Sequence, residues 1–305
     1  MGGNSASTLV NAKRLEGKTA IVTGCNVGIG KETVKELYKS GARVIMACRD
    51  TEKANAAAES IQKDLENSKD VGTLVVKPLN LSSLKSVREC AADINQSEPR
   101  VHILINNAGV MMVPKGETED GFETHLGVNH FGHFLFTCLL LPKLIASAPS
   151  RIINVSSKAH EWGKIDFNDL NCKNSQYNPR LAYSHSKIAN ILFTVELARR
   201  LKDKGVTAYS LHPGIVRTEL GRYIDETYFT GAQKIARVLF YPISKSPAQG
   251  ALTTLYCTYK DVENDSGAYF SDCMLKKRFD TEDDLKQAKL LWEESCKLVD
   301  HQPEI

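Results

Sequence analysis

The 305-residue sequence lacks any run of consecutive apolar residues long enough to cross a bilayer, which takes roughly 18 to 20 residues. Its first residues, MGGNSAS, hold no apolar segment, so we expect neither a signal peptide nor a hydrophobic anchor there. The chain begins Met1-Gly2, as N-myristoylation requires, but Ala6 stands where that signal has Ser or Thr. Acylation is therefore the weaker alternative to a flexible polar tail over 1–14. We expect a cytoplasmic protein whose contact with membranes, where it occurs, is peripheral.

Charge and cysteine patterns exclude several classes of protein. The formal net charge is only +3, and the short basic run 276–278 is interpreted as a solvated turn, so no nucleic-acid partner is expected. The eight cysteines stand singly without a C-x-x-C pair, which argues against a zinc site and is typical of reduced thiols in the cytoplasm. His125, His130 and His133 fall on one expected helix, but a metal site needs more ligands, and no metal is predicted.

Apolar, β-branched stretches alternate with longer amphipathic stretches along most of the chain. This alternation is typical of a parallel sheet with helices on both faces. No Pro- or Ser-rich linker divides the sequence, so we expect a single α/β domain over 15–305. Strands are expected at 19–23, 43–47, 74–76, 101–106, 151–155, 206–211 and 268–270, and helices at 29–40, 51–66, 83–97, 120–146, from 182 onward, 248–259 and 281–299.

The segment 221–247 departs from this regular pattern and is rich in aromatic residues. They are Tyr223, Tyr228, Phe229, Phe240 and Tyr241. Such a segment can fold over an active site as a lid that encloses an apolar substrate and touches a membrane, or it can be ordinary core or a dimer contact. We interpret it as a substrate lid, because lids gate water and product release at active sites.

Three glycines follow the first expected strand and open the first expected helix. In the run TGCNVGIG, Gly24, Gly28 and Gly30 let the chain turn tightly and let a pyrophosphate approach the backbone. The free N–H groups and the dipole at the start of the helix favour the same anion. The strand before and the helix after predict a dinucleotide site in a doubly wound Rossmann fold, with Asn26 and Ile29 in the same loop.

This G-x-x-x-G-x-G spacing resembles the short-chain dehydrogenase/reductase family. The stretches DGFETHLGVNH at 120–130, AYSHSKIAN at 182–190 and SGAYFSDC at 266–273 are most similar to the retinol dehydrogenase 11–14 type. The resemblance covers nearly the whole chain. It implies an NADP(H)-dependent oxidoreductase that interconverts retinal and retinol, or other lipophilic carbonyls and alcohols, and it allows a homodimer.

The chemistry is predicted to depend on Tyr183 and Lys187, which are four residues apart and share one face of a helix. A free tyrosine has a pKa of about 10, and a nearby ammonium is expected to lower that pKa towards neutrality. The resemblance implies that Lys187 also binds the nicotinamide ribose, that Ser157 holds the substrate oxygen and that Asn129 supports a proton relay. Ser156 is the alternative to Ser157 as the residue that holds the substrate oxygen. If it does not have this role, Ser156 is a simple turn residue.

We expect the residues at the end of the second strand to decide whether the protein binds NAD(H) or NADP(H). The resemblance places Cys48 where NAD-dependent members carry an acid, and Arg49 can form charge-assisted bonds to a 2′-phosphate, which favours NADP(H). The alternative is a surface Arg49 paired with Asp50. Asn80 stands in place of an acid usual near the adenine but keeps an acceptor oxygen. The other contacts that the resemblance implies are Leu81, Asn107, Ala108, Gly109, Pro213, Gly214 and Thr218.

Three other functions fit parts of the pattern. A broad-specificity carbonyl reductase for steroids, quinones or xenobiotic ketones would use the same catalytic residues. A nucleotide-sensing binding protein would keep the fold without turnover, but it would not need Ser157, Tyr183 and Lys187 together. A sugar-nucleotide epimerase also uses a Tyr–Lys pair at this spacing, but its larger substrate domain has no counterpart after residue 215. His160 and His185 are candidates to flank the substrate pocket, with packing as the alternative.

Overall fold

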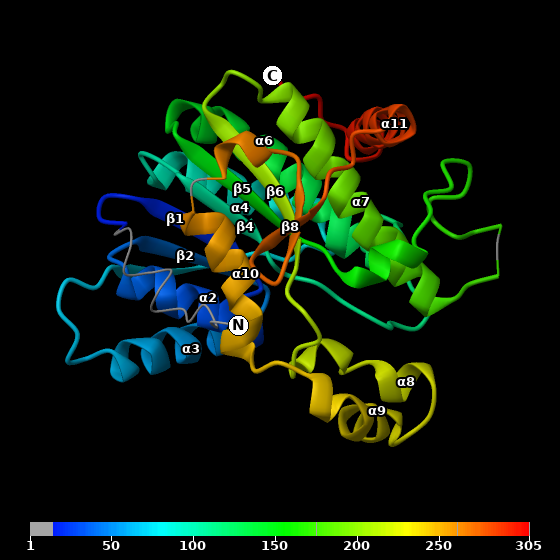
Figure 1. The fold of residues 1–305 in the computed structure, drawn as a ribbon, viewed down its shortest axis with the longest axis horizontal. Coiled ribbons are helices and arrows are strands. Elements are labelled where there is room, and N and C mark those ends of the chain that lie inside the picture. Colours follow the sequence, from blue (N-terminus) through cyan, green and yellow to red (C-terminus); the bar gives the residue numbers. More distant parts are fainter. Residues whose placement is uncertain (1–14, 175, 261, 305) are drawn as a thin grey trace.

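The computed structural model describes residues 15–174, 176–260 and 262–304, so the expectations of flexibility and acylation in the tail 1–14 lie outside the described residues. Within these residues the chain forms a sheet in the order β3-β2-β1-β4-β5-β6-β7-β8, in which only β7 and β8 pair antiparallel (Figure 1). The strands are β1 Thr19–Thr23, β2 Arg43–Cys48, β3 Thr73–Pro78, β4 Ile103–Asn106, β5 Ser150–Val155, β6 Val206–His212, β7 Tyr269–Ser271 and β8 Met274–Lys277. The prediction of a doubly wound, mostly parallel α/β fold is confirmed.

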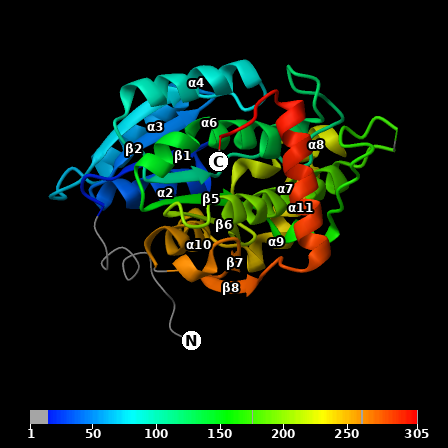
Figure 2. The ribbon, with the colours of Figure 1, turned by 90° about the horizontal axis from the view of Figure 1, so that it is seen from above.

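Two apolar layers hold the helices against the sheet. In β1 the buried Ile21 packs with Phe134 on one face, whereas its neighbour Val22 packs with Leu37 on the other. This alternation follows from the pleat, because successive side chains of a strand point to opposite faces. One face is covered by α2 Gly28–Lys39, α3 Thr51–Asp64 and α10 Pro247–Tyr259, and the other by α4 Leu84–Ser97, α6 Gly132–Ala146 and α7 Pro179–Arg200. The last helix, α11 Glu282–Leu298, packs along α7 (Figure 2).

The helix expected over 120–146 is divided into three parts. These are α5 Thr124–Leu126, a π-helical turn over Gly127–Phe131, and α6. The prediction of one regular helix was therefore wrong at the π turn. Taken together, Thr124–Ala146 is long and apolar enough to span a membrane by length and composition. However, 72% of its most apolar window is buried inside the protein, as in a core helix.

Two further regions differ from the sequence expectations. The basic run predicted as a turn contributes Lys276 and Lys277 to the exposed edge strand β8. The segment 221–247 contains α8 Ile224–Thr227 and α9 Ala232–Phe240, which project from the sheet layers in Figure 1. Both regions lie at the surface, where hydrophobic periodicity carries the weakest signal.

Candidate active site

The expected site residues gather where the carboxyl ends of β1, β4, β5 and β6 meet. The strand order reverses between β1 and β4, since β2 follows on one side of β1 and β5 follows on the far side of β4. Doubly wound sheets bind their ligands in the crevice at such a point. The glycine loop, the NNAG element over 106–109 and the Tyr183 helix all open onto this edge.

The glycine loop is packed too tightly for side chains. Gly24 and Gly28 have φ of 60°, in the left-handed region that favours glycine. A Cβ on Gly30 would lie 2.7 Å from the Cα of Cys25 and 2.9 Å from the carbonyl oxygen of Gly24. The N-cap of α2, Val27, makes no side-chain cap, so the first N–H groups of the helix remain for an anion. The loop therefore fits a dinucleotide pyrophosphate.

The two other loop residues predicted to contact cofactor differ in exposure. Asn26 is partly exposed at the loop surface. Ile29 is turned towards α10, because a Cβ on Gly250 would lie 3.1 Å from its Cγ1. The Ile29 side chain therefore packs in the apolar layer under α2 and leaves only its backbone for a ligand.

The NNAG element is tied to the glycine loop by hydrogen bonds through Thr23. The Oγ1 atom of Thr23 accepts the N–H groups of Asn107 and Ala108, each at 3.0 Å. In return, the Nδ2 atom of Asn107 donates to the carbonyls of Thr23 (2.9 Å) and Gly24 (3.1 Å). The ends of β1 and β4 thus form one rigid floor.

His133 extends this network from the floor towards Asn129. Its Nδ1 donates to the carbonyl of Asn129 at 3.0 Å, so its Nε2 is the acceptor of the Thr23 hydroxyl proton at 2.8 Å. Burial lowers the pKa of His133 to about 4, which keeps the ring neutral for this role. The sequence pointed to His133 only as an unpromising metal ligand.

Asn129 lies in the π turn and links the loop after β4 to α7. Its Oδ1 accepts from the N–H of Val110 (2.8 Å), while its Nδ2 donates to the carbonyl of Val110 (3.0 Å) and to Ser186 Oγ (2.9 Å). The Ser186 hydroxyl donates in turn to the carbonyl of Tyr183 at 2.7 Å. π turns recur at functional sites because the extra residue re-aims a side chain, here that of Asn129.

The Tyr183 and Lys187 side chains lie together near the start of α7. Asn178 caps this helix by accepting two backbone N–H bonds, and Pro179 occupies its first position. The Nζ atom of Lys187 lies 5.5 Å from the centre of the Tyr183 ring and donates to the carbonyl of Val155 at 3.1 Å. Gly109 approaches the same ammonium, since a Cβ there would lie 3.7 Å from it.

Burial dominates the acidity of this pair. It raises the pKa of Tyr183 to about 12, and a hydrogen bond with Ser157 only partly opposes that shift. Burial also lowers the pKa of Lys187 to about 8. The expectation of a tyrosine pKa near neutrality is therefore not met here. A phenol with a raised pKa keeps its proton at pH 7.

The two serines that end β5 have different roles. Ser156 is buried, and its hydroxyl donates to the backbone carbonyl of Lys187 at 2.7 Å, which fixes α7 against the strand. Ser157 is the serine that hydrogen-bonds with Tyr183. His160 donates from Nδ1 to the carbonyl of Ser157 at 2.7 Å and packs edge-on against Tyr269, so it supports Ser157. Between the two candidates, the geometry favours Ser157 as the partner of a substrate oxygen.

Arg49 is exposed just beyond β2. The neighbouring carboxylate of Asp50 pairs with Lys53 at 3.1 Å and accepts its N–H at 3.0 Å as the cap of α3. Tyr223 lies against Arg49. The pKa of Tyr223 is lowered mainly by a hydrogen bond from Arg222, and the charge and hydrogen bonding of Arg49 lower it further. Asp50, the partner that the sequence left open for Arg49, thus bonds Lys53, while the Arg49 guanidinium lies against Tyr223.

The residues expected near the adenine are engaged in local contacts. Asn80 Oδ1 accepts the N–H of Ser82 at 3.1 Å, and its Nδ2 donates to Glu119 Oε1 at 3.2 Å. Leu81 is buried and packs into the core beside Gly132. The acceptor oxygen of Asn80 is therefore already used in a turn, and Leu81 offers mainly its backbone.

The segment after β6 lies across the crevice. Gly214 has φ of 95° just after the buried Pro213, which lets the chain leave the sheet edge. A Cβ on Gly28 would lie 3.1 Å from the Cγ2 of Thr218, so Thr218 rests on the glycine loop. Val216 and Lys245 form a parallel bridge, so the excursion between them leaves and returns at one point.

This excursion also contacts the loop after β4. Tyr228 donates to Met112 Sδ at 3.7 Å, and Thr227 Oγ1 donates to the carbonyl of Met112. Among the predicted aromatic cluster, Tyr228, Phe229 and Tyr241 are exposed, while the side chain of Phe240 lies outside the described residues. These contacts suit a lid over the crevice, and the lid assignment stays a prediction.

A buried acid–histidine–tyrosine cluster that the sequence did not reveal supports the Met112 loop. Glu123 accepts from the Nδ1 of His125 at 2.7 Å, and the Nε2 of His125 accepts the N–H of Val113 at 3.1 Å. The Tyr177 hydroxyl donates to the carbonyl of Val113 at 3.0 Å. These residues are far apart in sequence except for Glu123 and His125, and no motif spacing marks them. Within the described residues, no group of three or more His, Cys, Asp or Glu side chains is arranged to hold a metal.

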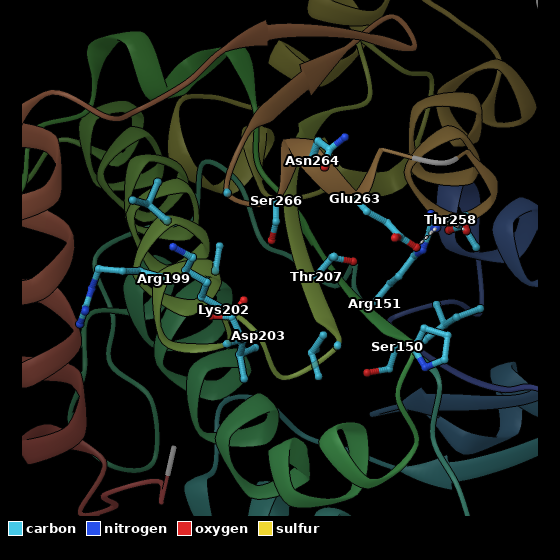
Figure 3. Close-up of a pocket in the computed structure, with 18 of the residues that line it drawn as sticks. Ser150, Arg151, Arg199, Lys202, Asp203, Thr207, Thr258, Glu263, Asn264 and Ser266 are labelled. Carbon is cyan, nitrogen blue, oxygen red and sulfur yellow. Dashed lines mark hydrogen bonds and ion pairs between the residues drawn. The ribbon is translucent and has the colours of Figure 1, made fainter.

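A cavity of about 910 Å³ lies at the opposite edge of the sheet, by the amino ends of β5 and β6 (Figure 3). Its wall includes Ser150 and Thr207, and Arg151 there reaches the carbonyl of Thr258 at 3.2 Å. None of the predicted site residues lines it, so we assign the chemistry to the carboxyl edge. A smaller cavity of about 190 Å³ includes His185 and Leu126 beside α7. His185 thus lines this cavity, and its place beside a substrate stays a prediction.

Comparison with known proteins gives a consistent result. Residues 18–228 match the family model described as short chain dehydrogenase. Human retinol dehydrogenase 12 is 48% identical over 94% of this chain and 87% of its own length, and human retinol dehydrogenase 13 is 49% identical over 93% and 85%. Mouse retinol dehydrogenase 11 is 48% identical over 97% and 90%.

Solved structures agree with the fold. An uncharacterised protein from Mycobacterium paratuberculosis is 34% identical and superposes with a TM-score of 0.78 over 100% of both chains. RhlG from Pseudomonas aeruginosa, solved as an NADP active-site complex, is 25% identical with a TM-score of 0.66 over 85% of this chain and 95% of its own.

The packing of the glycine loop predicts the effect of one added methyl group. Gly30→Ala forces the loop apart, and overpacking of this kind costs about 1–3 kcal/mol, so we expect about 5- to 150-fold weaker NADPH binding. Gly116→Ala is the matched control, because its Cβ would meet nothing closer than Thr124 Oγ1 at 3.3 Å. Fluorescence titration with NADPH measures both. Equal affinities for the two variants would contradict the assignment of the loop.

Proposed function

Since this chain belongs to the short-chain dehydrogenase family, whose members use NAD(P)(H), we propose that it interconverts retinal and retinol, with NADP(H) as cofactor. The observation that carries the proposal is the cluster of the buried Tyr183 and Lys187 with the partly buried Ser157 at the carboxyl edge of the sheet. The names of the relatives at 48–49% identity supply the substrate.

Each residue of the site has a distinct role in the reaction. Tyr183 holds a proton at its hydroxyl and delivers it to the substrate oxygen, which Ser157 holds by a hydrogen bond. Lys187 places a positive charge beside the phenol, and Asn129 fixes the loop and helix that carry these groups. The bound nicotinamide supplies the hydride.

The first experiment follows NADPH oxidation by the purified protein with all-trans-retinal. Steroid ketones, quinones and simple aldehydes serve as competing substrates, because a broad carbonyl reductase would use the same residues. Tyr183→Phe removes the proton donor, so we expect turnover to fall about 10²- to 10⁴-fold, the usual contribution of a general acid, with little change in NADPH affinity.

Each outcome separates the candidates. Turnover of the other carbonyls without retinal would replace the retinoid substrate by the broad carbonyl reductase. Tight NADPH binding without any turnover would favour a nucleotide-sensing protein. Undiminished turnover by Tyr183→Phe would remove Tyr183 from the mechanism.

We propose NADP(H) rather than NAD(H) because a cation, not an acid, stands after β2. Cys48 stands in the position of the acid, the exposed Arg49 follows it, and the carboxylate of Asp50 bonds Lys53. An arginine at this point accommodates a 2′-phosphate. RhlG, a relative by fold, was solved with NADP.

Arg49→Leu tests this preference. Loss of hydrogen bonds to a charged group costs about 1.5–3 kcal/mol, so we expect the KM for NADPH to rise about 10- to 150-fold. The KM for NADH, which has no 2′-phosphate, should change little. Lys63→Leu, at the far end of α3, is the control. An equal rise in the KM for NADPH and the KM for NADH would mean that Arg49 does not bind the 2′-phosphate.

We further propose that the protein is cytoplasmic and meets the bilayer surface through α9. Ile235, Val238 and Leu239, at helical spacing, are 52%, 68% and 69% exposed, and Phe229 beside them is 59% exposed. Lys234 is exposed on the same helix. Apolar side chains flanked by a basic residue are typical of interfacial helices. A membrane-dissolved substrate would enter at this point, because the excursion that carries α9 lies over the crevice.

Co-sedimentation with phosphatidylcholine–phosphatidylserine vesicles tests this contact. Burying one leucine side chain contributes about 1.5–3 kcal/mol, so Leu239→Asp should weaken vesicle binding by at least about tenfold. Leu285→Asp, on the exposed face of α11, is the matched control. Turnover of a water-soluble aldehyde should be the same in both variants. Equal vesicle binding by the two variants would rule out α9 as the contact.

A further inference from the structure

Two cysteines from different elements touch inside the cofactor crevice. Cys25 is the second residue of the glycine loop, and Cys48 is the last residue of β2, directly before Arg49. Their Sγ atoms lie 3.7 Å apart, although the residues are 23 positions apart in sequence. Both side chains are buried, and neither is in a disulfide. Neither thiol has a part in the chemistry assigned to Tyr183.

The backbone of the glycine loop makes the two thiols unequal. The N–H of Cys25 donates to the sulfur of Cys48 at 3.3 Å, while the thiol of Cys25 bonds the carbonyl of Val22 at 3.2 Å. Hydrogen bonding from the Cys25 thiol lowers the pKa of Cys48, burial opposes this, and the N–H groups of Gly24, Cys25 and Asn26 lower it further. Burial raises the pKa of Cys25. Cys48 is thus the more readily ionised sulfur, with a second thiol in contact to resolve its oxidised form.

We propose that Cys25 and Cys48 are an oxidation site that forms a reversible disulfide across the 2′-phosphate end of the cofactor crevice. The expected loss of NADPH affinity rests on the proposed NADP(H) site, whereas the oxidation of the two thiols does not depend on it. The oxidant is hydrogen peroxide, which converts a thiolate to a sulfenic acid.

The reaction balances in two steps. The Cys48 thiolate attacks peroxide, its sulfur bonds one oxygen as the O–O bond breaks, and hydroxide leaves, which takes up a proton to become water. The sulfur of Cys25 then attacks the sulfenic sulfur of Cys48, and the second oxygen leaves as water with the Cys25 proton. Two thiols lose two electrons and two protons, and one peroxide becomes two waters. A dithiol reductant such as dithiothreitol reverses the oxidation.

The disulfide would alter the cofactor site directly. An S–S bond is about 2.0 Å long, so the sulfurs must approach by about 1.7 Å from their 3.7 Å separation. The glycine loop is already fixed to β2 by the bond from the Gly24 N–H to the Ala47 carbonyl at 2.9 Å. Closing the S–S bond therefore pulls Cys25 and its neighbouring N–H groups towards Arg49. We expect about tenfold or greater loss of NADPH affinity, because a pyrophosphate site depends on the position of those N–H groups.

The test treats the full-length protein with hydrogen peroxide and maps its peptides by mass spectrometry without reduction. The expected product is a peptide pair joined through Cys25 and Cys48 that has lost two hydrogens, formed more slowly when NADPH is bound. NADPH titration of the oxidised protein should show the loss of affinity, and dithiothreitol should restore it. The peptide map does not depend on catalysis, so it remains informative even where the proposed retinal reduction fails.

Variants identify the sulfurs. Cys25→Ala and, separately, Cys25→Ser should abolish both the joined peptides and the peroxide-dependent loss of NADPH affinity. Cys90→Ala is the matched control, since Cys90 is buried on α4 away from the crevice and burial raises its pKa to about 12. Absence of the joined peptides in the wild-type protein would overturn the proposal. So would an equal loss of affinity after peroxide in Cys25→Ala and wild type.

Discussion

One threonine hydroxyl holds the two halves of the active site together. Thr23 Oγ1 accepts two backbone N–H groups from the end of β4 and donates its proton to His133. From His133 the bonds continue through Asn129 and Ser186 to the backbone of Tyr183. The phosphate loop and the tyrosine helix are therefore positioned by the same buried network. Such networks are strong when every member is satisfied and costly when one is removed.

The burial that gives this network its strength also sets the chemistry. Lys187 is 4% exposed, and an ammonium taken from water is costly unless it is hydrogen-bonded. Its bond to the Val155 carbonyl and its place beside the Tyr183 ring compensate part of that cost. Tyr183 meets the same low-polarity surroundings and holds its proton more firmly. The fold thus holds the protonated phenol of Tyr183 beside the ammonium of Lys187 in a buried place.

Local patterns explain why much of the fold and the cofactor loop could be predicted from the sequence. β1 matches its expected bounds, because an apolar β-branched run between a turn and a glycine loop has few other structures. The glycines at 24, 28 and 30 were informative because the first two need a left-handed backbone and the third has no room for a side chain. In contrast, His133, Glu123 and Tyr177 act through partners 54 to 110 residues away, and no local spacing encodes such contacts. The π turn at Asn129 and the strand β8 were missed for the same reason, since tertiary packing selects them.

The bridge between Val216 and Lys245 has a consequence for how this enzyme can change over time. Because the chain leaves and re-enters the body at one point, the residues between form an insert whose ends are a fixed distance apart. Closing a longer loop costs only about 0.6 kcal/mol per doubling of its length. Residues in this insert can therefore be replaced, lengthened or shortened without disturbing the strands beneath. In this way the insert can diversify while the residues around Tyr183 stay constant.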